Sequence, residues 1–363
     1  FSLGSKEPDI EHLQVMDVDI VDFDSDDFAL TKNSMFFPSP DGKKIAVFYP
    51  KIICIFAADG DELGCQEFPE RLASVDFHSV QWSPDSKMIV FTENFYRYMF
   101  EPDLWLLDVD AMSLNNLTDD GIEKEALGKQ NALFDIFPQW IEDGKKIAFL
   151  RMLLEEEENV LCWMDPLRGE VEEAIKLPYK VIDGIAFSRD GKTYAFIIRE
   201  KSNWSVYGGK LEYSTPELWF EADRPIFEVG FSADAKYLMI QEWLPEKLNF
   251  VAHLLDIASG EEVQTLEEVQ DGGDMLLLTK FAWAPAGSAF LYFGRDLKSK
   301  ELSLFAGKPG EEPRKIEVWD EYPRGLTTLD DDRWFSIPWC ADNTLLLFNP
   351  AESELLRIYL AEE

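Results

Sequence analysis

Three aspartates alternate along one short segment of the chain, Asp22, Asp24 and Asp26, and this spacing could hold a hard cation. Ca²⁺ prefers oxygen ligands such as carboxylates and needs roughly six to eight of them. The segment lacks the glycine and the distal glutamate of an EF-hand loop. Because a chain with 70 acidic side chains also contains such runs by chance, we expect a solvated loop here and no bound cofactor. The three aspartates remain the candidate for a metal site.

The motifs that carry catalysis in many enzymes are missing from the sequence. There is no G-x-S-x-G nucleophile elbow and no glycine-rich phosphate loop. The three histidines, His12, His78 and His253, are far apart in the chain. A metal-dependent catalytic site usually needs several histidines or carboxylates that converge on one point. We therefore expect each histidine to be structural.

The four cysteines do not decide whether the protein belongs to an oxidising or a reducing compartment. Cys54, Cys162 and Cys340 lie in apolar, strand-like runs, where a free thiol is usually a small core residue. Cys54 and Cys65 flank an aspartate-glycine turn and would face each other if the hairpin register allowed it. A longer or bulged loop would separate them, so the sequence does not decide whether they form a disulfide.

The elements that must position these residues come from a repeat. Each unit consists of an apolar or aromatic pair, a small polar turn, and a lysine or its substitute that opens a second apolar run. The seven units begin near Phe36, Val80, Pro138, Ile185, Val229, Phe281 and Ile337. Their turn aspartates, or the residues in that place, are 44 to 58 residues apart. This spacing is consistent with the roughly 40 to 50 residues of a four-stranded propeller blade plus inserted loops.

Four strands can be assigned within a unit. In the second unit they are Val80–Trp82, Met88–Thr92, Leu104–Val109 and Leu114–Thr118. The last unit supplies only three before the chain ends: Ile337–Trp339, Leu345–Phe348 and Leu355–Leu360. The missing strand is expected at His12–Phe23, where apolar and acidic residues alternate with the period of a strand.

The repeat and the missing strand together predict the fold class. We expect an all-β chain, a single domain over residues 1–363, that forms a seven-bladed β-propeller of four-stranded antiparallel blades. Pairing the N-terminal strand with the last unit would close the ring and remove two sheet edges.

The net charge excludes several classes of partner. The chain carries 34 basic and 70 acidic side chains, which gives a net charge of −36. Such a surface repels phosphate backbones and anionic lipid, so we expect no binding to nucleic acid. No apolar run approaches the roughly 18 residues of a membrane span, so we expect no membrane insertion. A basic partner or a cation would fit this charge, as would solubility alone.

The phrases WSPDSK, LWLLDVD and LNNLTDD in the second unit, with FSRDGK in the fourth, resemble the TolB-like, WD-repeat-related β-propellers. The resemblance covers about residues 13–362. The repeated turn is specific for the fold and not for a function. In the sixth unit Ala286 replaces the turn aspartate, and the turn of the seventh unit is degenerate. The resemblance implies a platform that binds proteins, a role that such propellers often have in the cell envelope.

The two faces of such a ring are unequal. Connections from the first to the second strand of a blade, and from the third to the fourth, share one face and are tight here; we call it the tight-turn face. The other connections share the opposite face, the long-loop face, where insertions collect. Aromatic side chains beside arginine are typical of binding hot spots, although any single ring could instead pack onto the blades. The candidate binding residues in these insertions are Phe95, Tyr96, Arg97, Tyr98, Phe100, Trp204, Trp243 and Phe250.

We predict a non-catalytic platform that binds a protein or peptide, with a basic partner as one option. Two alternatives stay open: a hydrolase or lyase that uses carboxylates at the mouth of the central channel, and an accessory propeller of a separate catalytic subunit. A deep pocket with carboxylates of shifted pKa would favour an enzyme, and a broad aromatic rim would favour a platform. The expected state is a monomer, and the sequence gives neither the partner nor the compartment.

Overall fold

The computed structural model describes residues 6–23, 34–72, 74–94, 102–119, 121, 133–153, 158–179, 182–212, 215–245, 249–266, 276–296, 301–319, 339–349 and 354–362. The predicted aromatic insert at residues 95–100 lies outside these ranges, as do Asp24 and Asp26. Within the described ranges, no helix has the length and apolar character needed to cross a membrane.

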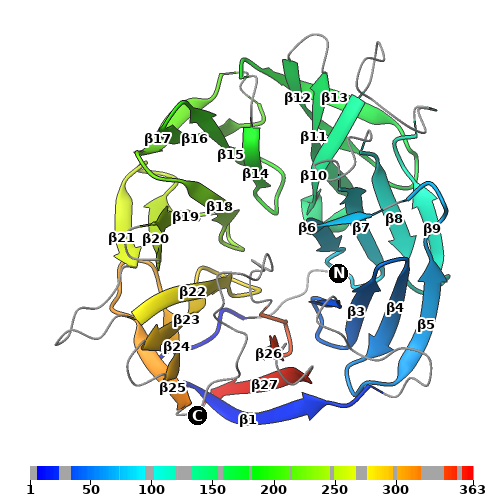
Figure 1. Cartoon of the computed structure of the whole chain (residues 1–363). Helices are drawn as coiled ribbons and strands as arrows, with labels where there is room; N and C mark the ends of the chain where they lie inside the picture. The colour runs from blue at the N-terminus through cyan, green and yellow to red at the C-terminus, as the bar shows by residue number, and fades with distance from the viewer. Residues whose placement is uncertain are drawn as a thin grey trace.

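Seven antiparallel sheets form a ring around a central axis, with the first strand of blades 1 to 6 nearest that axis (Figure 1). The chain is therefore an all-β, seven-bladed β-propeller, as the sequence predicts. The described ranges contain a single helix, the 3-10 turn η1 (Glu142–Gly144). Blades are numbered from blade 1, which begins at β2, to blade 7, which combines the two ends of the chain.

In blades 1 to 6, consecutive strands pair in chain order from the axis outward. Blade 1 comprises β2 (Met35–Pro38), β3 (Lys44–Tyr49), β4 (Ile52–Ala57) and β5 (Glu62–Glu67). Blade 2 comprises β6 (Val75–Trp82), β7 (Met88–Glu93), β8 (Leu104–Asp108) and β9 (Ser113–Asn116). Blade 3 comprises β10 (Leu133–Ile141), β11 (Lys146–Leu153), β12 (Glu158–Met164) and β13 (Val171–Leu177).

The next three blades continue the same pattern. Blade 4 comprises β14 (Ile182–Phe187), β15 (Thr193–Glu200), β16 (Asn203–Lys210) and β17 (Glu217–Ala222). Blade 5 comprises β18 (Ile226–Phe231), β19 (Tyr237–Leu244), β20 (Asn249–Asp256) and β21 (Glu262–Leu266). Blade 6 comprises β22 (Leu276–Trp283), β23 (Phe290–Asp296), β24 (Leu302–Gly307) and β25 (Arg314–Trp319).

Blade 7 closes the ring by combining two strands from the C-terminal end of the chain with one from the N-terminal end. It consists of β26 (Thr344–Asn349), β27 (Glu354–Glu362) and β1 (Leu13–Val21), and β1 forms the outer strand. At the inner edge, Trp339 adds an isolated bridge to Leu345. The predicted closure by the N-terminal strand is confirmed, because β1 pairs antiparallel with β27 along its length.

A serine and an aspartate at equivalent positions stabilise the repeated turn in four of the blades. In blade 1, Ser39 Oγ donates to Asp41 Oδ1 at 2.6 Å, and that carboxylate accepts from the amide of Lys43 at 3.1 Å. Ser39 Oγ also accepts from the amide of Lys44 at 2.9 Å. Serine and aspartate recur here because their side chains can bond the turn backbone. Equivalent bonds hold the turns of blades 2, 4 and 5 through the pairs Ser83 and Asp85, Ser188 and Asp190, and Ser232 and Asp234.

The core is divided among the gaps between blades. In the described ranges, seven apolar clusters lie one between each pair of neighbouring blades. Between blades 1 and 2, for example, Phe48 meets Phe91 edge-on with ring centroids 5.6 Å apart. Each sheet therefore buries its faces only against its neighbours, which is why the fold needs the complete ring.

The four cysteines divide into one pair and two single thiols. Cys54 and Cys65 occupy paired positions on β4 and β5 and form a disulfide, which answers the question that the sequence leaves open. Cys162 and Cys340 are free and buried, as predicted for core residues. Burial raises the pKa of each of these thiols to about 12.

Candidate functional site

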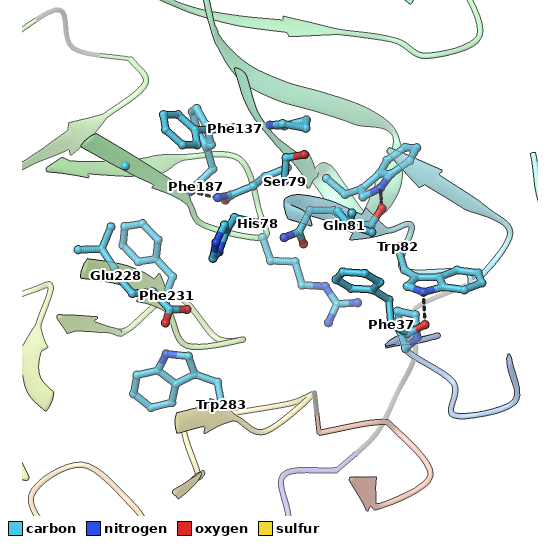
Figure 2. A pocket seen from close by; sticks show the side chains of 18 of the residues that line it. Phe37, His78, Ser79, Gln81, Trp82, Phe137, Phe187, Glu228, Phe231 and Trp283 are labelled. Carbon is cyan, nitrogen blue, oxygen red and sulfur yellow. Dashed lines mark hydrogen bonds between the residues drawn. The ribbon is translucent and has the colours of Figure 1, made fainter. Parts of the chain in front are cut away.

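The inner edges of the blades enclose a cavity of about 930 Å³ along the axis. A cavity with mostly apolar walls and a few polar groups is typical of ligand sites. Figure 2 shows aromatic rings and the His78 imidazole arranged around the open centre. Each blade contributes at least one aromatic ring to the wall; from blade 1 to blade 7 these include Phe37, Phe77, Phe137, Phe187, Phe227, Trp283 and Trp339.

β-bulges in the inner strands direct several side chains toward the axis. The pairing register shifts within β6, β10, β14, β18 and β22. The bulged residues include His78, Phe137, Asp183 and Phe227, and all four line the cavity. A bulge adds a residue to one strand and re-aims its side chains, and bulges are common beside functional sites.

The bulge of blade 2 changes where its inner strand begins. The sequence predicts this strand at Val80–Trp82, whereas β6 begins at Val75. Pairing with β7 shifts between Asp76 and Gln81. The extra residues break the alternation of apolar and polar side chains, so the sequence pattern shows only the part of the strand that follows the bulge.

Three hydrogen bonds fix the conformation of this bulge. Asp76 Oδ1 accepts from the amide of His78 at 3.1 Å, and Ser79 Oγ donates to the carbonyl of Asp76 at 2.6 Å. Ser79 Oγ in turn accepts from the amide of Thr92 on β7 at 2.8 Å. The Ser79 hydroxyl is thus buried and engaged, while the His78 side chain is exposed to the cavity (Figure 2).

An arginine crosses the cavity at the tight-turn face. Arg189 lies in the first turn of blade 4, and its Nε lies 3.3 Å from Asp143 Oδ1 in blade 3. Its Nη1 donates to the carbonyl of Pro285 in blade 6 at 3.4 Å. Because blade 5 separates blades 4 and 6, this guanidinium links turns that are not neighbours in the ring. The tight-turn face of the cavity is therefore narrowed by a side chain.

Tryptophans near the ends of the inner strands tie neighbouring blades together around the cavity. The indole Nε1 of Trp82 donates to the carbonyl of Phe37 at 2.9 Å. Trp283 makes the equivalent bond to Gly230 at 3.0 Å, and Trp140 makes it to the carbonyl of Gln81 at 3.2 Å. Each bond satisfies a polar group at the edge of an apolar cavity, so the wall is preorganised.

The charged residues of the cavity wall are mainly acidic. Its described lining contains three carboxylates, those of Asp76, Asp183 and Glu228, and one guanidinium, that of Arg189. Burial raises the pKa of Asp76 above its ordinary value, and the nearby His78 offsets part of this shift. Burial also raises the pKa of Asp183.

A cation outside the cavity reaches one of these carboxylates. Arg199 Nε lies 3.6 Å from Asp183 Oδ2, and this arginine offsets part of the rise in the pKa of Asp183. The Arg199 guanidinium also lies 5.3 Å from the ring centre of Trp204. This stack holds the arginine over a half-buried ring on β16.

The predicted binding residues lie in three different settings. Trp204, predicted in an insertion, instead lies on β16 of blade 4 and is not among the residues that line the cavity. Its ring lies against Arg199, which pairs with Asp183 of the cavity wall. Trp243 and Phe250, predicted in an insertion, instead face each other on the paired strands β19 and β20 of blade 5, with ring centroids 4.7 Å apart. Phe250 is buried and lines the cavity, and both rings contact Phe227 edge-on. The other five candidates, at residues 95–98 and 100, lie outside the described ranges.

In the part of the chain that the structure describes, one group of residues could ligate a metal, and it does not line the cavity. Asp9, Glu11 and His12 form one surface group with ligand atoms within 4.8 Å of one another. His253 instead lies between two glutamates on neighbouring strands, with Nδ1 3.0 Å from Glu262 Oε1 and Nε2 3.2 Å from Glu242 Oε2. Along the described cavity wall, His78 is the single imidazole.

Several residues of the cavity wall are not predicted from the sequence, although they share one position within the repeat. His78, Asp183 and Phe227 each stand seven residues before the aspartate of the turn in their unit. When the units are aligned on that aspartate, the three residues hold equivalent positions in the repeat. The three residues are of different types, so the repeat pattern does not mark this position as special. The bulges in the structure show that it faces the axis.

The fold and the cavity define a class: a seven-bladed β-propeller with an aromatic-lined central cavity. No protein-family model matches the sequence, and no curated protein matches it. Among solved structures, the chain is similar to an oligogalacturonate lyase from Vibrio parahaemolyticus, with a TM-score of 0.61 and 12% identity over 96% of this chain and 97% of that one.

Two further solved structures extend the comparison. An oligogalacturonate lyase in complex with manganese has a TM-score of 0.54 and 13% identity over 91% of this chain and 96% of that one. A chain of a mitotic checkpoint complex has a TM-score of 0.58 and 14% identity over 99% of this chain and 96% of that one. At these identities the likeness shows the propeller fold and leaves the function to be argued from the site.

Proposed function

We propose that this propeller is a non-catalytic binding module that takes a segment of a protein or peptide into its central cavity from the long-loop face. The observation that carries the proposal is the setting of Phe227. Its side chain is 52% exposed although it stands in the cavity wall. A bulge of β18 puts it there, and bulged residues are often functional.

The neighbours of Phe227 make it a rigid anchor. Its ring centroid lies 6.5 Å from that of Trp243 and 5.8 Å from that of Phe250, both edge-on. Hot spots at protein interfaces are commonly aromatic side chains in well-packed surroundings. Through this cluster, two of the binding candidates predicted from the sequence, Trp243 and Phe250, contact a residue of the cavity wall.

The direction of entry follows from the tight-turn face. Arg189 crosses that face, and neighbouring turns are bonded to one another there, as between Ala341 N and the carbonyl of Pro40 at 2.8 Å. A partner would therefore approach the cavity from the long-loop face. The resemblance of the repeated turns to TolB-like propellers supports the same role, since it implies a protein-binding platform.

The test uses two variants with matched side chains. Partners captured from the native source on the immobilised full chain would be purified and their affinities measured for wild type, Phe227→Ala and Leu218→Ala. Leu218 is the control because its side chain is 46% exposed on the outer strand of blade 4, away from the cavity. If Phe227 is a hot spot, its truncation should weaken binding about 30-fold or more, while the control should change affinity less than threefold.

Equal affinities for all three proteins would refute binding in the cavity. A variant Phe227→Ala that binds like wild type but melts at a lower temperature would show that the ring only packs against blade 5. The predicted insert can be tested with the same partner: Tyr96→Ala with Tyr98→Ala should cost roughly 2 kcal/mol or more of binding free energy if the sequence interpretation holds.

A second candidate function is a carboxylate-dependent lyase or hydrolase, and one observation favours it. Asp76 and Asp183 line a deep cavity with pKa values raised by burial, which general acids require. The similar lyases act on oligogalacturonate according to their names. The wall of this cavity suits such an anion poorly, because its described guanidinium, that of Arg189, is already paired with Asp143.

Turnover of uronate oligomers separates the lyase from the binding module. A β-elimination leaves a conjugated double bond that absorbs ultraviolet light, so wild type and Asp76→Asn can be compared directly. The binding module predicts no absorbance change with either protein. A rise in absorbance with wild type that Asp76→Asn abolishes would establish the enzyme instead.

A further inference from the structure

We infer that the central cavity selects a positively charged side chain, lysine or arginine, carried on a segment of the partner. This inference rests on the proposed function and names the chemistry of the ligand at that same site. It follows from three features of the described cavity: the sign of its charges, the aromatic rings beside them, and the engagement of its own cation.

The carboxylates of the wall come from three blades. Asp76 belongs to blade 2, Asp183 to blade 4 and Glu228 to blade 5. Asp183 lies at the bulge of its strand, and Glu228 directly follows the bulge of the next. A group that enters between these blades thus meets negative charge on more than one side.

Burial leaves two of these carboxylates incompletely compensated. Desolvation is the largest influence on both Asp76 and Asp183, and it raises the pKa of each despite His78 and Arg199 nearby. In such a setting the charged form is disfavoured because protein replaces water around it. A ligand cation would restore the missing compensation, whereas a ligand anion would increase the penalty.

Aromatic rings hold positions that are equivalent or adjacent to those of the carboxylates in the repeat. Phe227 and Asp183 hold equivalent positions in neighbouring units, each seven residues before its turn aspartate. Phe137 occupies the bulge of blade 3. The face of an aromatic ring attracts ammonium and guanidinium groups within about 6 Å of its centroid, and the apolar rings also accommodate the methylene stem of a long basic side chain.

Among the residues that the structure describes, few basic side chains of the protein itself are placed to pair with the carboxylates of the cavity. Arg189 is committed to Asp143 and to the carbonyl of Pro285 at the tight-turn face. No lysine lines the cavity among the described residues. The net charge of −36 adds a field that draws cations toward the molecule, and a cavity with low-dielectric walls focuses such a field.

The test is a set of acetylated pentapeptide amides that differ only at the central position: lysine, norleucine, arginine, citrulline or glutamate. Binding is measured by calorimetry at low ionic strength, because salt screens the charge interaction. The proteins are wild type, the double variant Asp76→Asn with Asp183→Asn, and the control Asp61→Asn. Asp61 is exposed in the β4–β5 turn, so its substitution changes the charge outside the cavity.

We expect lysine and arginine peptides to bind wild type at least about tenfold tighter than their neutral counterparts. The double variant should reduce this ratio below about threefold without weakening the norleucine peptide, and Asp61→Asn should preserve it. Equal binding of charged and neutral peptides, or tightest binding of the glutamate peptide, would overturn charge selection and leave peptide binding intact. Absence of binding by every peptide would overturn both proposals.

Discussion

The carboxylate of Glu7 accepts a hydrogen bond from the amide of Ser288 at 2.7 Å, across 281 positions of sequence. The same oxygen, Oε1, accepts from the amide of Ala289 at 3.1 Å. These two amides belong to the first turn of blade 6, where Ala286 stands in place of the aspartate of the other turns. Glu7, which lies outside the repeat, therefore provides the carboxylate acceptor that this turn lacks.

In blade 1, the two amides at the equivalent positions bond to side chains of the turn itself. There the amide of Lys43 bonds to Asp41, and the amide of Lys44 bonds to Ser39. One oxygen of Glu7 satisfies both equivalent amides in blade 6. The close approach also explains a glycine: a Cβ added to Gly287, whose φ is +73°, would lie 2.4 Å from the Glu7 carboxyl carbon.

Replacing this carboxylate should loosen blade 6. Glu7→Ala leaves two turn amides without their acceptor, and hydrogen bonds to charged groups contribute about 1.5–3 kcal/mol. We expect a loss of about 1–2 kcal/mol of unfolding free energy, measured by urea denaturation, because solvent reaches part of the site. Glu11→Ala is the control, since Glu11 is exposed on the same segment.

A rescue experiment tests the mechanism itself. Adding Ala284→Ser and Ala286→Asp to the Glu7→Ala chain rebuilds the serine and aspartate of the other turns and should recover most of the lost stability. Failure of this triple variant to recover any stability would show that Glu7 acts by another route.

The Glu7 contact marks a limit of sequence reasoning. The turn of blade 1 was predictable because Ser39 and Asp41 are local to the backbone that they bond. Ala286 is recognisable as a departure from this pattern, but the residue that replaces the aspartate comes from a distant segment and leaves no local signal in the sequence. The N-terminal strand was predictable because the last unit lacked a strand, and alternation identified one candidate.

Loss of the N-terminal segment should open the ring. A chain without residues 1–23 loses β1 and Glu7 together, which exposes the outer edge of β27 and frees the turn of blade 6. Exposed strand edges favour association, so we expect soluble aggregates in light scattering at concentrations where the full chain is monodisperse. A chain without residues 1–5 serves as the control, and an aggregation profile equal to this control would contradict the role of β1.

Stability should fall as the pH rises from about 4.5 to 7, and Glu93 is one cause. Burial raises the pKa of Glu93 from 4.5 to about 7, with Trp105 as its hydrogen-bond donor and Asp103 as a nearby like charge. Between these pH values the folded state holds a proton that the unfolded state has released, so unfolding becomes easier as the pH rises. Above pH 7 the full penalty is present.

The variant Glu93→Gln should remove this dependence. It keeps an acceptor for the Trp105 indole and carries no charge, so it should be more stable than wild type at pH 8 by roughly 1–3 kcal/mol. At pH 4.5 the two proteins should differ little. Thermal unfolding across this pH range provides the measurement, and Glu67→Gln, an exposed glutamate of β5, is the control. A variant that parallels wild type at every pH would contradict the assignment.

The cavity was less predictable than the ring. Phe250 and Trp243 were selected as aromatic residues of an insertion, and the structure puts them beside Phe227, which the sequence reading missed. A bulge is set by the competition between strand pairing and local side-chain bonds, such as those of Ser79. That competition depends on the neighbouring strand, so the strand pattern alone does not locate it.

The thiols give a count that tests the core and the disulfide together. Cys162 and Cys340 are buried with pKa values of about 12, so at pH 8 the native protein should react very slowly with a thiol reagent, because the thiolate is the nucleophile. Unfolding without reductant should expose two reactive thiols, and unfolding after reduction should expose four, because Cys54 and Cys65 are joined. Rapid reaction of the native protein would contradict the burial of Cys162 and Cys340. Four reactive thiols without reductant would instead show that the disulfide of blade 1 does not form.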